Sequence, residues 1–343
     1  MKYYFLSILK RRTPIIIALT IIFLIVAVVI NNVSSYIEMT FIEGVYCEVP
    51  RKGLFIVYII GILLLSIIVT LIEFSFKMLR IQSQQAYSFP ILREKLFLAR
   101  YLVGLIEIVI PFVVAFFVSS LMVYTQDNLY NLKYLWLYLP CILASGILSY
   151  SYLSFMYCRA NNIIDGIAGM LLSVLAPLSF GIAVEMFLNR FNIELIHGYY
   201  FTPLYVIDYL TSLMETLLVG EAIGISWIPL AFFSFWVVIT GLTIGFMDYF
   251  NKRIKSEDIA SDSNSLFTYQ IFIGLATVSL TVILSFFISL WAPILCMGLT
   301  FGGYILYKRG IDFEEKNMQA IIISLSELVL GILLASFQWG GLL

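Results

Sequence analysis

Charged and histidine side chains are scarce in this sequence. Of its 343 residues, only 12% are charged while 62% are hydrophobic, and the single histidine is His197. An average globular chain has roughly 25% charged residues, so a soluble fold of this size would leave much apolar surface in water. The shortage of charge therefore excludes a soluble enzyme or a disordered protein. The shortage of histidine excludes a histidine-rich metal site.

Several functional signatures are also missing. Lysine and arginine (20) are balanced by aspartate and glutamate (21), so no basic field is available to bind nucleic acid. The four cysteines form no CxxC pair, and neither HExxH nor GxSxG occurs. No glycine is followed by lysine, which excludes a Walker A phosphate loop. We therefore expect no catalytic residue, no metal and no cofactor in this chain.

Long uncharged stretches are what the sequence has in abundance. A helix needs about 20 mostly apolar residues to cross the hydrocarbon of a bilayer. Nine candidate spans lie at 13–37, 54–72, 108–126, 134–158, 166–184 and 222–247, twice within 263–307, and at 317–343. The pattern predicts an all-α fold, a polytopic transmembrane helix bundle of about nine spans.

Lysine and arginine are distributed unevenly between the two sides of such a bundle. They concentrate before the first span, in 77–100, in 251–265 and in 308–316. The opposite loops hold only Arg51, Lys52, Lys133 and Arg190. Because cytoplasmic loops carry the excess of basic residues, we expect a multi-pass plasma-membrane protein with its N-terminus in the cytoplasm. Nine spans would place the C-terminus outside.

The segments between the spans define the expected organisation. Residues 1–12 have the pattern of an amphipathic helix lying in the inner interface. Residues 13–250 form a six-span core, residues 251–265 an inner linker and residues 266–343 a three-span C-terminal extension. Within the core, 75–101 is a long inner segment and 189–224 an aromatic outer segment of short helices, while 31–53 is a smaller outer loop.

Acidic residues in or beside the spans are candidates for function, because placing them in a bilayer is costly. Glu73 and Glu185 lie at span ends, from which they can reach the interface. Glu327 lies about ten residues into the ninth span, and an isolated acid there most often faces a polar bundle interior.

Glu107 lies near the inner end of the third span, one turn before Pro111. Arg100 precedes Glu107 by seven residues, two turns away on the same helix face, so an ion pair between them is possible if the helix starts early. Glu107, Pro111 and Glu327 are therefore the candidates for a substrate path.

The inner segment contains a motif that resembles one in a known family. Pro90 separates two pieces capable of forming helices, and the second runs into the third span. The run resembles the loop that enters the third span of type-2 ABC exporter permeases. The matching residues are Ser88, Pro90, Ile91, Arg93, Leu96, Phe97, Ala99, Arg100 and Pro111. Phe89 stands where that family usually has leucine, and Leu92 where it has serine or threonine. The order of parts over residues 1–250 is also similar, and the rest of the chain lies outside the resemblance.

This resemblance implies the transmembrane subunit of an ATP-driven exporter. Two permease copies, or two related permeases, would pair with separate ATP-binding subunits that hold ATP and Mg²⁺. The inner segment would dock into the ATPase as a coupling helix, and the contact residues expected there are Ile81, Gln85, Tyr87, Phe89 and Arg93. Spans rich in Ile, Leu and Phe suit a hydrophobic or amphipathic substrate, such as a peptide or a lipid-like molecule.

Two other classes stay open at the level of sequence. An ion- or proton-coupled secondary transporter would use Glu107 and Glu327. A membrane-embedded enzyme or assembly factor would show turnover by the purified chain alone.

Overall fold

The computed structural model describes part of the chain. The described residues are 2–33, 37–42, 45–50, 52–88, 91–127, 132–160, 163–189, 196–219 and 227–251, with isolated positions after residue 274. Phe89, Glu327, residues 252–265 of the predicted linker 251–265 and almost all of the predicted extension 266–343 lie outside them. So do the side chains of Tyr87 and Arg93, although both residues belong to described helices.

Five helices in the described part are long and apolar enough to cross a membrane. They are α1 (Lys2–Val33), α2 (Lys52–Phe74), α4 (Arg93–Asp127), α5 (Leu132–Cys158) and α6 (Ile163–Asn189). They confirm the existence of the first five predicted spans. The sixth predicted span corresponds to α8 (Trp227–Asn251), which contains a shorter apolar segment, Trp227–Thr243.

The predicted outer loop 31–53 contains a β-hairpin, so the described fold is helical with one exception. Strand β1 (Ile37–Ile42) pairs antiparallel with β2 (Val45–Pro50), in a register that sets Ile42 opposite Val45. β-branched and aromatic residues are frequent in both strands, which favours extended backbone. The expected outer loop therefore contains regular structure, which hydropathy alone does not predict.

The N-terminal segment and the first span form one helix. We expected residues 1–12 to be a separate interfacial helix, but α1 runs from Lys2 to Val33 with Pro14 inside it. Leucine, lysine and arginine favour helix across residues 6–12, so local propensity gives no reason to stop before the apolar run. At 1.5 Å per residue α1 is about 48 Å long, more than the roughly 30 Å of a hydrocarbon core. Its first turns therefore extend beyond the hydrocarbon.

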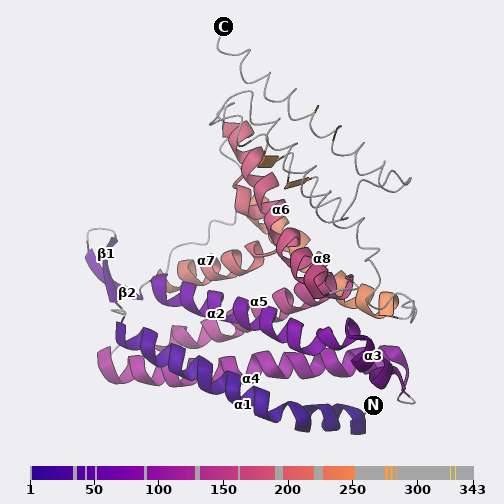
Figure 1. Cartoon of the computed structure of the whole chain (residues 1–343). Coiled ribbons are helices and arrows are strands. Elements are labelled where there is room, and N and C mark those ends of the chain that lie inside the picture. Colours follow the sequence, from indigo (N-terminus) through magenta and orange to yellow (C-terminus); the bar gives the residue numbers. More distant parts are fainter. Residues whose placement is uncertain are drawn as a thin grey trace. The chain divides into compact units, whose positions relative to one another are not determined.

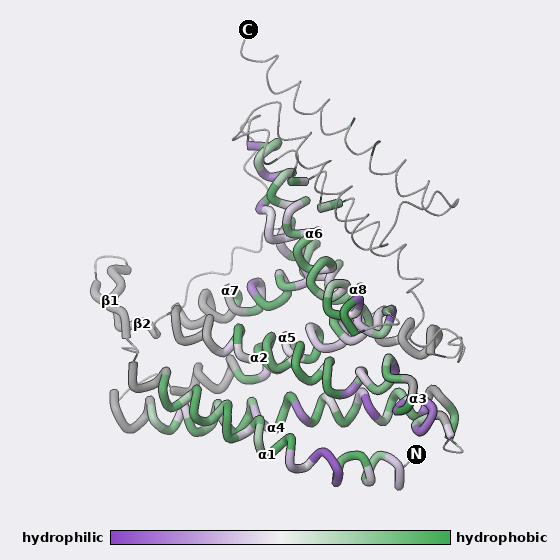
Figure 2. The backbone as a smooth tube through the Cα atoms, in the orientation of Figure 1, coloured by the Kyte–Doolittle hydropathy of each residue, from purple (hydrophilic) through white to green (hydrophobic). Residues whose placement is uncertain are grey.

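The helices near the N-terminus pack as a bundle. Helix α1 packs along α4, α2 lies against α4 and α5, and α8 lies against α5 and α4 (Figure 1). The short helices η1 (Ser75–Lys77) and α3 (Arg80–Tyr87) connect the end of α2 to the start of α4. Figure 2 shows hydrophobic residues along much of α1, α2 and α4, with many of the hydrophilic ones toward α3. We call this the α3 end of the bundle.

The chain divides into two compact units. The first unit is Met1–Ile163 with Val206–Asp262, and the second is Ile164–Tyr205 with Ser263–Leu343. The predicted six-span core included α6, which instead belongs almost wholly to the second unit, together with η2 (Gly198–Phe201). Hydropathy locates spans along the chain, but it carries no information on which spans pack together.

Candidate functional site

The α3 end of the first unit holds the inner segment for which the sequence predicts contact with a partner. After α2, the chain turns through η1, where the backbone N–H of Met78 donates to the carbonyl of Ser75 at 3.0 Å. The ammonium of the buried Lys77 donates to the carbonyl of Cys158 at 2.8 Å. This bond anchors the turn to the last residue of α5, where carbonyls have no partner within the helix.

Helix α3 is fixed to the bundle by one face. Phe76, Ala86 and Leu96 form a buried apolar cluster, against which Tyr4 and Ile91 pack. The cluster thereby joins the start of α1, η1, α3 and the start of α4. Because these residues come from four elements, one face of α3 packs where η1 meets the starts of α1 and α4.

The opposite face of α3 is open. Ile81 is 74% exposed, and Gln85, one turn further on, is exposed as well. Leu79 and Leu92, at the two ends of the segment, are also exposed. The structure thus brings two of the five predicted contact residues to one accessible surface. The predicted contacts Tyr87, Phe89 and Arg93 have side chains outside the described residues.

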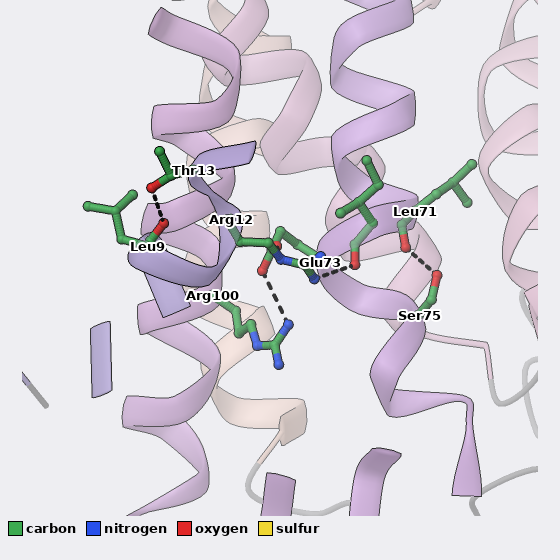
Figure 3. A network of polar contacts seen from close by, with 8 residues as sticks. Leu9, Arg12, Thr13, Leu71, Glu73, Ser75 and Arg100 are labelled. Atoms are coloured by element: carbon green, nitrogen blue, oxygen red, sulfur yellow. Dashed lines mark hydrogen bonds and ion pairs between the residues drawn. The ribbon is translucent and has the colours of Figure 1, made fainter. Parts of the chain in front are cut away.

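A buried ion-pair cluster lies beside α3, and the sequence did not predict it. The Glu73 carboxylate is fully buried and contacts Arg12 Nε at 2.6 Å and Arg100 Nη1 at 3.5 Å (Figure 3). Arg12 also donates to the carbonyl of Ile72 at 3.1 Å. The Arg100 guanidinium lies 4.4 Å from the centre of the Phe76 ring, a cation–π geometry. Three helices, α1, α2 and α4, meet at this one carboxylate.

Two sequence-based expectations about these acids were wrong. Glu73 does not reach an aqueous interface, and Arg100 pairs with Glu73 on α2 and not with Glu107 on its own helix. Side chains two turns apart on one helix are about 10 Å apart along its axis, whereas neighbouring helices bring termini much closer. The sequence does contain a signal for this pairing. Glu73 is an acid at the end of one span, and Arg12 and Arg100 are cations near the ends of two others.

Glu107 lies deeper in the same helix and is fully buried. Neither of its carboxyl oxygens has a hydrogen-bond partner among the described residues. Pro111, one turn further, is also buried within α4. The two described substrate-path candidates therefore face the protein interior.

Aromatic rings fill the space between the helices near Glu73 and Glu107. The Tyr101 ring of α4 stacks on the Tyr150 ring of α5 at 5.3 Å, and the Tyr101 hydroxyl lies 2.6 Å from Ser151 Oγ. Phe74 stacks on Phe97 at 5.1 Å. The cluster is thus separated from the rest of the bundle by a packed, largely apolar layer.

The second unit has a polar contact of its own. Glu185 of α6 accepts a hydrogen bond from the backbone N–H of Gly198 at 2.7 Å and lies 3.3 Å from His197 Nδ1. The ring of His197 stacks parallel to that of Tyr199. In the described part of the chain, the predicted aromatic outer segment does form short helices, η2 and, in the first unit, α7 (Tyr205–Val219).

Neither unit offers a metal centre within the described residues, since no group of three or more histidine, cysteine, aspartate or glutamate side chains comes together there. No family model matches the chain, and no curated protein or solved structure matches it either. The class that the fold defines is a helical membrane protein, built on five helices long enough to span a bilayer.

Proposed function

We propose that the chain is the transmembrane subunit of an ATP-driven ABC exporter and that α3 is its coupling helix. The observation that carries the proposal is the attachment of α3 to two spans by one face, with Ile81 and Gln85 exposed on the other. An element held in this way transmits a push on its open face to α2 and α4 as a rigid-body motion. The resemblance of residues 87–102 to type-2 exporter permeases supports the same reading.

In this proposal the motor is a separate chain. The sequence has no phosphate loop, so ATP and Mg²⁺ are held by an ATP-binding partner. The excess of lysine and arginine in the loops on the side of α3 favours the cytoplasmic side for this contact. A second permease copy, or a related permease, completes the exporter in the plasma membrane. The substrate class is a hydrophobic or amphipathic peptide or a lipid-like molecule.

The test is formation of a complex with a candidate ATP-binding subunit, after co-expression and capture from detergent-solubilised membranes. Ile81→Glu places a charge on the open face and should weaken binding by about 2 kcal/mol, roughly 30-fold, if Ile81 is an interface anchor. Affinity is measured by titrating the ATPase onto the captured chain. ATP hydrolysis by the complex gives a second readout.

Two variants control for unrelated effects. Ile81→Leu keeps the apolar contact and should bind like the unmodified chain. Gln82→Glu adds the same charge at a neighbouring exposed position of α3 and should lose less affinity than Ile81→Glu. Failure of the unmodified chain to retain the ATPase, or equal binding by Ile81→Glu, would overturn the proposal.

A proton-coupled secondary transporter is a second candidate, favoured by one observation. Glu107 is a fully buried acid without a hydrogen-bond partner in the described residues, as expected of a coupling site. The two candidates differ in their energy source. In vesicles that hold ATP and the ATPase, collapsing the proton gradient should leave ATP-driven export running and should stop a secondary transporter.

A further inference from the structure

Glu107 occupies an unusual position for a carboxyl group. It follows Arg100 by seven residues on α4, which places it about 10 Å further along the helix axis. It lies within the apolar stretch Lys95–Met122, its exposed fraction is 0%, and both carboxyl oxygens lack a hydrogen-bond partner in the part of the chain that the structure describes. Its charge state therefore has to be explained by its surroundings.

The ionisable groups around Glu107 come from four helices. They are Arg12 of α1, Glu73 of α2, Arg100 of α4 and Tyr150 of α5. Helix α8 also packs against α4, but its segment Trp227–Thr243 has no titratable side chain. Both cations are already in contact with another acid, since Arg12 and Arg100 bind Glu73.

The difference in exposure decides which groups carry charge. The side chains of Arg12 and Arg100 are 21% and 15% exposed, so water at the α3 end solvates the positive charge that Glu73 leaves uncompensated. Glu107 is fully buried, and neither of its carboxyl oxygens has a hydrogen-bond partner among the described residues. An unpaired carboxylate in such a place costs far more free energy than a neutral carboxylic acid.

We propose that Glu107 is a proton-binding site within the first unit. The carboxylate takes a proton from a hydronium ion supplied at the α3 end, leaving a water molecule and a neutral carboxylic acid, while Glu73 stays ionised between the two guanidinium groups. Arg100 Nε, on the same helix as Glu107, is also buried without a hydrogen-bond partner among the described residues. The site requires no particular energy source, so it stands whether transport is driven by ATP or not.

Infrared spectroscopy of the purified chain tests the proposal without any transport assay. The unmodified protein at neutral pH should show the carbonyl stretching band of a protonated carboxylic acid. Glu107→Gln should remove this band, and exchange into D₂O should shift it in the unmodified protein. Glu73→Gln is the matched control and should keep the band, because Glu73 is ionised. Glu107→Met should also lack the band, so the difference spectrum between the unmodified protein and a second variant checks the assignment.

Stability gives an independent readout. If folding takes up one proton at Glu107, the unfolding equilibrium of the unmodified protein shifts about tenfold per pH unit relative to Glu107→Gln. As the pH rises from about 6 to about 8, the free energy of unfolding of the unmodified protein should therefore fall relative to that of Glu107→Gln. A band that survives in both Glu107 variants, or is lost in Glu73→Gln instead, would overturn the proposal. A stability difference that does not change with pH would overturn it as well.

Discussion

Glu73→Ala is expected to destabilise the first unit more than any other single substitution at the α3 end. The carboxylate is fully buried and contacts Arg12 at 2.6 Å and Arg100 at 3.5 Å. Its removal leaves two guanidinium groups close together without a counter-charge, and breaking a buried ion pair costs about 3–5 kcal/mol. Because both arginines retain some contact with water, we expect the lower value, about 3 kcal/mol. Thermal unfolding in detergent measures the loss.

Two comparisons make this prediction specific. Glu73→Gln keeps the size and one acceptor oxygen, so its loss should be smaller than that of Glu73→Ala. Glu185→Ala also removes a helix acid, but Glu185 is 29% exposed, and its charged-group partner His197 is 49% exposed. We expect a change of about 1 kcal/mol or less there. Unfolding of Glu73→Ala at the temperature of the unmodified protein would show that the cluster does not hold α1, α2 and α4 together.

The spans and the two helices on either side of Pro90 could be predicted because their signals are local. Each of the first five spans is a run of apolar residues long enough to cross a bilayer, and each appears as a helix in the structure. The break at Pro90 and the helix entering the third span are also local features, and α4 does begin at Arg93. The exposure of Ile81 and Gln85 on the same face of α3 is consistent with helical spacing, because residues four apart lie on one side of a helix.

The ion-pair cluster could not be predicted in the same way. Arg12 and Glu73 are 61 residues apart in sequence, and Arg100 and Glu73 are 27 apart. Sequence spacing indicates a partner for Arg100 only on its own helix, where Glu107 lies two turns further on. The true partner is decided by the packing of α2 against α4. Hydropathy likewise does not show which helices pack together, so it could not predict that the first unit is interrupted after Ile163.

The β-hairpin was missed although a local signal was present. In the observed backbone register Phe41 is paired with Tyr46, and the paired residues Ile42 and Val45 have Glu43-Gly44 between them in the sequence. Two strand-like runs separated by two such residues are typical of a hairpin. The expectation for residues 31–53 was an outer loop between two spans, without strands.

The contact between α6 and η2 in the second unit depends on the absence of two side chains. Gly181 of α6 and Gly198 of η2 lie backbone against backbone, and a Cβ atom on Gly198 would be 2.6 Å from the backbone nitrogen of Ile182. A Cβ atom on Gly181 would overlap the carbonyl oxygen of Gly198. The close approach lets the Glu185 carboxylate accept the hydrogen bond from the Gly198 N–H. Separation of η2 from α6 would therefore also lengthen this hydrogen bond.

Gly181→Ala is expected to separate η2 from α6 and to destabilise the second unit. Overpacking costs about 1–3 kcal/mol, and we expect the upper value because a backbone carbonyl cannot rotate away as a side chain does. Gly241→Ala is the matched control, since its Cβ would meet nothing within 4 Å, and alanine should stabilise helix α8 by roughly 0.5–1 kcal/mol. Thermal unfolding compares the two variants, and protease cleavage near Gly198 reports the release of η2. Equal stability of both variants, with η2 still protected, would mean that the Gly181 contact does not hold η2 in place.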